Sequence, residues 1–213
     1  QLNPCGWDYE SSDRRWIIDT CKELAIKIIS DEVYIDSMKG TEDYKPFHLE
    51  GEHCISINSL TKIYGLGSIR FGWIIANKEI TANAKRAFLT FSGMMSSPTI
   101  RLASSVFPHL DLAIEKIKHY RETNLPVLRE MLARQNIVWN EPPYGVFGAF
   151  QLPNGFDSMT FVDGACAEHS VLAVPGSMFS EELRGWLRVA WSIEPELFLE
   201  AILNLEKALI SID

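Results

Sequence analysis

The chain has 213 residues, of which 46% are hydrophobic and 23% are charged, and its formal net charge is −8 at pH 7. This composition is typical of a folded globular protein and excludes a disordered or collagen-like chain. Because Lys and Arg are scattered in an acidic chain, we expect no nucleic-acid partner. No run approaches the roughly 18–20 apolar residues of a membrane helix, so we expect no membrane partner.

Helices and strands alternate along the first 120 residues. A helix is expected to begin at Ser12 or Asp13, since either side chain can cap it, and another at Asn77 for the same reason. Three apolar runs rich in β-formers indicate strands between and after these helices. The expected strands cover residues 25–30, 53–58 and 70–76, and the expected helices continue over 77–91 and beyond Pro98.

A long helical pattern follows Pro108 and runs to about residue 135, and Pro126 is expected to kink or split it. Short strands and two helices come after it. The strands are expected at 137–139, 146–152, 171–174 and 187–191, and the helices at 158–168 and 194–212. We therefore predict an α/β fold in two parts. Residues 1–120 form a mostly parallel sheet with flanking helices, and residues 121–213 form a smaller α+β domain.

Cysteine and histidine spacing gives no sign of a metal site. The four cysteines are Cys5, Cys21, Cys54 and Cys166, and no two have the C-x-x-C spacing of a metal or redox pair. The five histidines form no paired-ligand motif either. We expect no metal, and unpaired apolar thiols fit a reducing, cytoplasmic location.

The chemistry-bearing segment follows the strand at 53–58. It contains Ser59, Lys62 and Arg70 around a turn with glycines at 65 and 67. Hydroxyl groups, a flexible turn and a guanidinium suit the binding of an anionic group. The lysine can donate hydrogen bonds to a phosphate or act as a nucleophile.

Three interpretations of this segment compete. A penicillin-binding-type pair of Ser59 and Lys62 also requires S-D-N and K-T-G motifs, which are missing. A dinucleotide-binding loop requires a third glycine where the chain has Arg70. In the third interpretation, Lys62 forms a Schiff base with an aldehyde cofactor whose phosphate is held by Ser59 and Arg70.

The third interpretation makes a further demand on the sequence. Pyridoxal phosphate is an electron sink only while its ring nitrogen is protonated, which needs a carboxylate nearby, and its phenolic oxygen needs hydrogen-bond donors. Asp31 and Tyr34 follow the strand that precedes the strand of Lys62. Because ligands bind at the carboxyl ends of strands in open α/β sheets, these residues favour pyridoxal 5'-phosphate.

Five motifs in this order resemble those of the fold-type I pyridoxal-phosphate enzymes, specifically the class I/II aminotransferases. The motifs are Asn3-Pro4-Cys5-Gly6, Asp31-Glu32-Val33-Tyr34, Ser59-Leu60-Thr61-Lys62 with Arg70, Val174-Pro175-Gly176 and Leu187-Arg188-Val189-Ala190. The resemblance spans nearly the whole chain. It implies that residues 1–120 are the C-terminal part of the large cofactor-binding domain and that 121–213 are the small domain. The family's N-terminal part does not appear, so we expect this fragment alone to hold the cofactor weakly or not at all.

The resemblance implies roles for the residues around the cofactor ring. Lys62 would carry the Schiff base and then shuttle a proton, as the catalytic residue. Asp31 would pair with the ring nitrogen, while Tyr34 and Asn3 would hydrogen-bond the phenolic oxygen.

The resemblance also implies which residues bind the phosphate of the cofactor and the carboxylate of the substrate. Ser59 and Arg70 would hold the cofactor phosphate, and Arg188 would bind the substrate carboxylate. The activity implied is amino-group transfer between an amino acid and a 2-oxo acid, by a protein that is a homodimer at full length. Another fold-type I enzyme, such as a C–S lyase, decarboxylase or synthase, is an alternative because the cofactor supplies the chemistry. A second alternative is a truncated, non-catalytic module.

Overall fold

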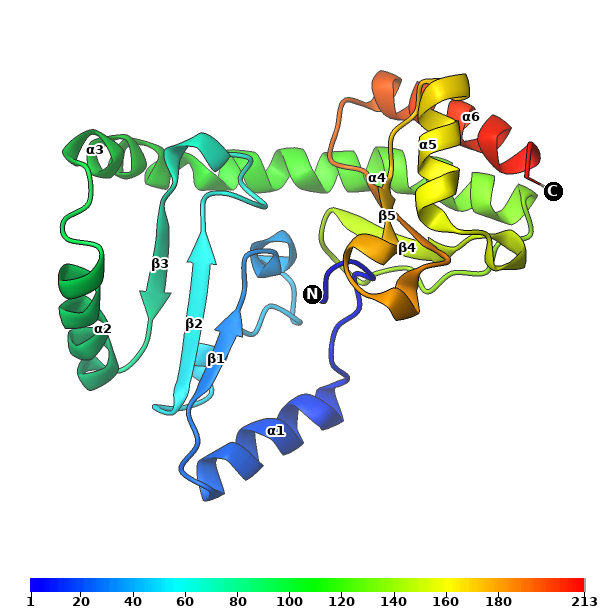
Figure 1. Cartoon of the computed structure of the whole chain (residues 1–213). Coiled ribbons are helices and arrows are strands. Elements are labelled where there is room, and N and C mark those ends of the chain that lie inside the picture. Colours follow the sequence, from blue (N-terminus) through cyan, green and yellow to red (C-terminus); the bar gives the residue numbers. More distant parts are fainter. Residues whose placement is uncertain (213) are drawn as a thin grey trace. The chain divides into compact units, whose positions relative to one another are not determined.

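The computed structural model describes residues 1–212, which divide into two compact units. One unit is Tyr9–Glu115, and the other combines Gln1–Asp8 with the chain from Lys116 onward. The long helix α4 (Leu110–Arg134) crosses the boundary in sequence (Figure 1). The domain boundary near residue 120 stays a prediction about the cofactor-binding and small domains. Within residues 1–212 no helix is long and apolar enough to cross a membrane.

The first unit contains a three-stranded sheet in the order β1-β2-β3 (Figure 1). Strand β1 (Ile28–Asp31) pairs in parallel with β2 (Cys54–Ser59), and β3 (Gly72–Ile75) pairs antiparallel with β2. The α/β class predicted from sequence is confirmed, although only one of the two pairings in this sheet is parallel. The backbone N–H of Leu60 donates to the carbonyl of Phe71 (3.0 Å). The connecting loop therefore stays at one edge of the sheet, and β3 must run back along β2.

Helix α1 (Ser11–Glu23) precedes this sheet. The expected cap is wrong, because Ser12 and Asp13 lie inside the first turn and Glu10 stands at the capping position. It ends where Ala25 takes a left-handed conformation (φ 55°). The N–H of Ala25 donates to the carbonyl of Lys22, and the N–H of Ile26 donates to the carbonyl of Cys21. This pair of hydrogen bonds is typical of a helix that ends at a residue in the left-handed conformation. The strand expected from residue 25 therefore starts only at Ile28.

Helices α2 (Lys78–Phe91) and α3 (Ser97–Val106) follow β3. The Asn77 side chain accepts a hydrogen bond from the N–H of Ile80 (2.9 Å), which confirms the predicted cap of α2. No described residue of α2 is buried.

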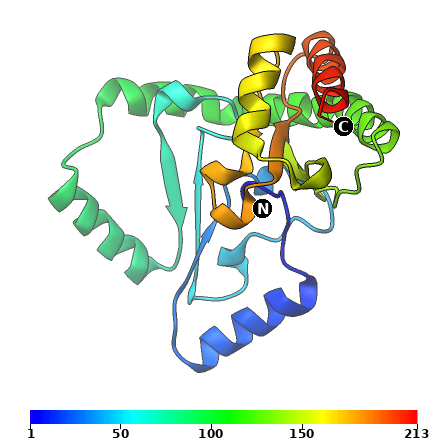
Figure 2. The same ribbon diagram turned by 45° about the vertical axis from the view of Figure 1, so that its right-hand side comes forward.

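The second unit contains the antiparallel sheet β4-β6-β5. Its strands are β4 (Phe147–Gln151), β5 (Val174–Pro175) and β6 (Trp186–Ala190). Helices α5 (Ser158–His169) and α6 (Pro195–Ile210) lie side by side in both Figure 1 and Figure 2.

Some expectations for this part of the chain are wrong. The strand expected at 171–174 is reduced to β5, which begins at Val174. Residues 137–139 form no strand, because Ile137 and Trp139 pack against the core while the segment has no pairing partner. Of the kink or split expected at Pro126, the split does not occur, because α4 is one helix across the proline. Leu125 and Leu128 on either side of the proline are buried in the core, and this packing holds both turns in place despite the missing N–H.

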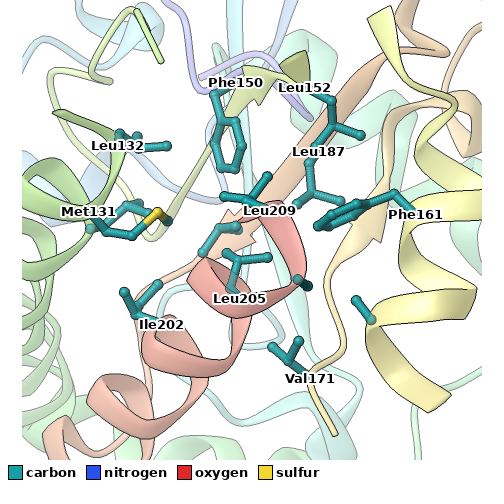
Figure 3. Close-up of a cluster of buried hydrophobic side chains, with 14 of the residues drawn as sticks. Met131, Leu132, Phe150, Leu152, Phe161, Val171, Leu187, Ile202, Leu205 and Leu209 are labelled. Atoms are coloured by element: carbon teal, nitrogen blue, oxygen red, sulfur yellow. The ribbon is translucent and has the colours of Figure 1, made fainter. Parts of the chain in front are cut away.

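The core of the second unit joins α4, α5, α6 and the sheet. Figure 3 shows side chains from these elements meeting, among them Met131, Phe150, Phe161, Leu187 and Leu205. Fully burying one large apolar side chain contributes about 1.5–3 kcal/mol, so this cluster is the main source of stability in the unit.

Replacing Leu187 tests this packing, because its side chain has no exposed surface and sits in the central strand β6. Leu187→Ala is expected to lower the free energy of unfolding by about 2–5 kcal/mol, measured by urea denaturation. Leu172→Ala, at a position that is 77% exposed, is the control and should change it by less than about 0.5 kcal/mol. Similar losses in both variants would contradict this description of the core.

Candidate active site

The carboxyl ends of β1 and β2 lie side by side. Asp31 pairs with Ile57, and the N–H of Glu32 donates to the Ile57 carbonyl (2.9 Å). Ser59 ends β2 and pairs with Gly72, the first residue of β3. The segments that follow β1 and β2, and the one that precedes β3, therefore meet at one edge of the sheet (Figure 1).

Strand pairing also determines which side chains share a face. Paired residues point to the same face and alternate residues along a strand do too, so Asp31, Ile57 and Ser59 share one face. Asp31 is exposed, and its Oδ1 accepts a hydrogen bond from the N–H of Val33 (3.3 Å). The hydroxyls of Ser59 and Thr61 lie 2.7 Å apart. A carboxylate and a pair of hydroxyls are thus placed on the same face, near the same edge.

Lys62 lies in a closed turn after β2. Leu60 and Ile63 are buried on either side of it, while Lys62 itself is exposed. The N–H of Gly65 donates to the Lys62 carbonyl, and the N–H of Leu66 donates to the Leu60 carbonyl, both at 2.9 Å. Within residues 1–212 the Lys62 amino group makes no hydrogen bond or ion pair. The amine is therefore available to react with a carbonyl or to bind an anion.

Arg70 precedes β3 in a left-handed conformation (φ 54°), which is uncommon for a residue with a side chain. Its neighbour Ile69 is buried, and its Nη1 donates to the Gly67 carbonyl (3.3 Å). Because Gly72 pairs with Ser59, Arg70 and Ser59 lie at the same edge of the sheet. A hydroxyl and an exposed guanidinium there suit a phosphate group.

Tyr34 lies in the turn after β1 and is half-buried. Its carbonyl accepts a hydrogen bond from the Ser37 hydroxyl (2.8 Å). Tyr34 is three residues after Asp31, and this hydrogen bond keeps it in the turn at the edge that also carries Lys62.

A buried carboxylate lies behind this edge. Asp36 is 6% exposed and accepts hydrogen bonds from the Tyr44 hydroxyl (2.8 Å), the Asn58 side-chain amide (2.6 Å) and the Tyr64 hydroxyl (2.7 Å). Burial and the adjacent carboxylate raise the pKa of both tyrosines well above the ordinary value. Asp36 and Asn58 are not singled out by the sequence, which gives no sign that Asp36 is buried.

A cavity of about 300 Å³ adjoins this carboxylate, and its walls include Asn58, Tyr64 and Trp73. Asn58 pairs with Trp73 on the face of the sheet opposite to that of Asp31. None of the predicted cofactor residues lines this cavity.

Arg188 lies on β6 in the second unit. Its Nη1 donates to Oδ1 of Asn3 (2.8 Å). Its guanidinium also lies over the ring of Phe147 (5.1 Å) and the ring of Phe179 (5.3 Å), where cation–π attraction steadies it. Phe179 is missed by the sequence analysis, because no spacing links it to Arg188.

The structure groups the predicted residues into two sets. Asp31, Tyr34, Ser59, Lys62 and Arg70 meet at one sheet edge of the first unit. Asn3 and Arg188 are in contact in the second unit. Their roles toward a cofactor or substrate stay predictions.

The model of the family described as aminotransferase class I and II matches residues 2–203. The chain belongs to this aminotransferase family. The match covers both sets of candidate residues.

Curated relatives and solved structures carry aminotransferase names as well. The chain is 27% identical to aromatic-amino-acid aminotransferase 2 of Thermococcus litoralis over 97% of this chain and 55% of that protein. It is 25% identical to a probable aminotransferase of Arabidopsis thaliana over 94% of this chain and 48% of that protein. A PLP-dependent aminotransferase from Streptococcus suis 89-1591 superposes with a TM-score of 0.87 at 24% identity, over 99% of this chain and 56% of that one. The chain thus spans about half the length of the relatives it matches.

The turn that places Asn3 depends on Gly6 in this aminotransferase chain. Gly6 has a φ of 80°, and a Cβ there would overlap the ring of Pro142 and lie 2.8 Å from the carbonyl oxygen of Phe147. Only glycine allows this backbone to approach so closely.

Gly6→Ala is therefore expected to destabilise the second unit by several kcal/mol, since it adds a steric overlap to an unfavourable φ. Gly155→Ala is the matched control, because Gly155 has a φ of 65° with nothing within 4 Å of the added Cβ. It should cost only about 1–2 kcal/mol. Thermal or urea unfolding compares the two variants, and equal losses would show that packing against Pro142 does not constrain the turn.

Proposed function

We propose that the complete gene product containing this chain transfers an amino group between an amino acid and a 2-oxo acid, using pyridoxal 5'-phosphate. The observation that carries the proposal is the unengaged amine of Lys62 at the sheet edge that also carries a carboxylate, a hydroxyl and a guanidinium. Family membership supports the same reaction.

The donor groups at this edge fit the proposed cofactor. An exposed carboxylate, Asp31, suits a protonated ring nitrogen. Ser59 and Arg70 suit a phosphate, and Lys62 suits an aldehyde carbon. When bound, the cofactor supplies an electron sink for the negative charge that develops at the substrate α-carbon.

The residues of the first unit would then divide the proton chemistry among themselves. Lys62 would take the proton from the α-carbon and return one, since an exposed amine without a fixed partner can move between two positions. Asp31 would keep the ring nitrogen protonated, and the Tyr34 hydroxyl would donate to the phenolic oxygen.

The residues of the second unit would bind the substrate carboxylate. The planar guanidinium of Arg188 can form two parallel hydrogen bonds to it. Asn3 would orient the guanidinium and donate to the phenolic oxygen, as the family resemblance implies. The rings of Phe147 and Phe179 would exclude water from the guanidinium and strengthen the interaction.

We also propose a cytoplasmic location and a homodimeric complete gene product. The cysteines in the described residues are free, and burial raises the pKa of the Cys5 and Cys54 thiols, which fits inert thiols in a reducing compartment.

Lys62→Ala in the complete gene product tests the proposed reaction. We expect loss of the visible absorbance of lysine-bound cofactor and at least about a thousandfold fall in amino transfer, because the variant lacks both the nucleophile and the proton carrier. Lys85→Ala, an exposed lysine of α2, should leave both unchanged. Release of ammonia or carbon dioxide in place of amino transfer would favour a lyase or decarboxylase, and an unchanged spectrum in Lys62→Ala would refute the role of the lysine.

Arg188→Lys tests carboxylate binding, because it keeps the charge but loses the two-pronged geometry. We expect the KM for both the amino acid and the 2-oxo acid to rise about 10–100-fold, equivalent to roughly 1.4–2.8 kcal/mol. Arg184→Lys, which alters an exposed ion pair with Asp157, is the control and should leave KM unchanged. An unchanged KM in Arg188→Lys would show that another group binds the carboxylate.

A further inference from the structure

We propose that Asp36 is a positioning residue that fixes the Lys62 turn against the segment after β1. The inference concerns the placement of the turn, and it rests on the proposed function only for what Lys62 does once placed.

The donors to Asp36 lie on both sides of Lys62. Asn58 is four residues before the lysine and Tyr64 is two residues after it. Both donate to Oδ2 of Asp36, at 2.6 Å and 2.7 Å. One carboxylate oxygen therefore holds the start and the end of the turn at once.

The Asn58 side chain also acts on the strand end itself. Its Oδ1 accepts a hydrogen bond from the N–H of Ser59 (2.7 Å) while its amide donates to Asp36. Ser59 is the predicted phosphate ligand, so the network reaches both it and the lysine turn.

Asp36 connects the Lys62 turn to the segment that follows β1. It lies in a short helix (Ile35–Met38) two residues after Tyr34 and five after Asp31. The four groups predicted to contact the cofactor ring and phosphate from β1 and β2 are Asp31, Tyr34, Ser59 and Lys62. A single buried carboxylate thus joins the two segments that carry them.

Burial makes this junction sensitive to geometry. Asp36 is 6% exposed, and within residues 1–212 it forms no salt bridge, so its stabilisation comes from three neutral donors. A buried carboxylate is tolerated only when its hydrogen bonds are made, and charge-assisted bonds are the stronger kind. The raised pKa of both tyrosines means that their hydroxyls stay protonated and able to donate.

The network leaves the Lys62 amine itself unengaged. Asn58, which donates to the carboxylate, lies on the opposite face of the sheet from Asp31, so Asp36 can hold the turn without pairing with the amine. A salt bridge between them would hold the amine away from its proposed reaction, and none exists in the described chain.

The two tyrosines provide a matched pair of variants. Tyr64→Phe and Tyr44→Phe each remove one hydroxyl from the same carboxylate, but only Tyr64 belongs to the Lys62 turn. Asp36→Asn removes the charge, so the bonds from Asn58 and Tyr64 lose their charge-assisted strength even where the amide oxygen takes the place of Oδ2.

The first measurement is amide hydrogen exchange in residues 60–66 of the folded chain, with no cofactor present. Tyr64→Phe and Asp36→Asn should accelerate it at least about tenfold, and Tyr44→Phe less than about twofold, because only the first two release the turn. Exchange in α6 should stay unchanged in all variants, which would exclude global unfolding. Equal acceleration by the two Tyr→Phe variants, or none, would overturn the inference.

The second measurement uses added pyridoxal 5'-phosphate with borohydride reduction and peptide mapping. The share of adduct on Lys62, relative to Lys85, should fall at least about fivefold in Tyr64→Phe and stay constant in Tyr44→Phe. If the unmodified chain forms adduct on Lys62 and Tyr64→Phe leaves this share unchanged, the inference fails and the proposed function stands. If the complete gene product without these substitutions forms no adduct on Lys62 but the exchange contrast holds, the proposed function fails and the positioning by Asp36 stands.

Discussion

The parallel pairing of β1 with β2 is the interaction on which the polar edge of the first unit depends. The bond from the Glu32 N–H to the Ile57 carbonyl sets the register in which Asp31 lies opposite Ile57. In this register Asp31 and Ser59 share a face, and the turn of Lys62 leaves the sheet beside the turn of Tyr34. A shift by one residue would send the Asp31 side chain to the opposite face, where the cavity lies.

The acidic chain nevertheless presents guanidinium groups suited to anions. Arg70 extends from a left-handed backbone and donates to a carbonyl, while Arg188 contacts an amide oxygen and two aromatic rings. A carbonyl, an amide oxygen and an aromatic ring carry no formal charge, so these contacts steady a guanidinium without neutralising it. We therefore expect local placement to matter more than the net charge of −8 for an anionic ligand at these positions.

The sequence predicted what local patterns encode. Apolar runs located β1, β2 and β3 to within a few residues, Asn77 marked the start of α2, and motif order indicated the aminotransferase family. Features that depend on tertiary packing could not be predicted. They include the left-handed Ala25 that delays β1, the segment 137–139 that packs without pairing, and the buried Asp36, whose three donors come from positions 8 to 28 residues away.

We propose that the edge formed by β1, β2 and the start of β3 holds pyridoxal 5'-phosphate through Lys62. The most direct measurement is a crystal structure of the complete gene product after borohydride reduction with the cofactor present. We expect cofactor density continuous with the Lys62 amine, with the ring nitrogen beside Asp31 and the phosphate between Ser59 and Arg70. Density attached to another lysine, or a phosphate bound away from Ser59 and Arg70, would contradict it.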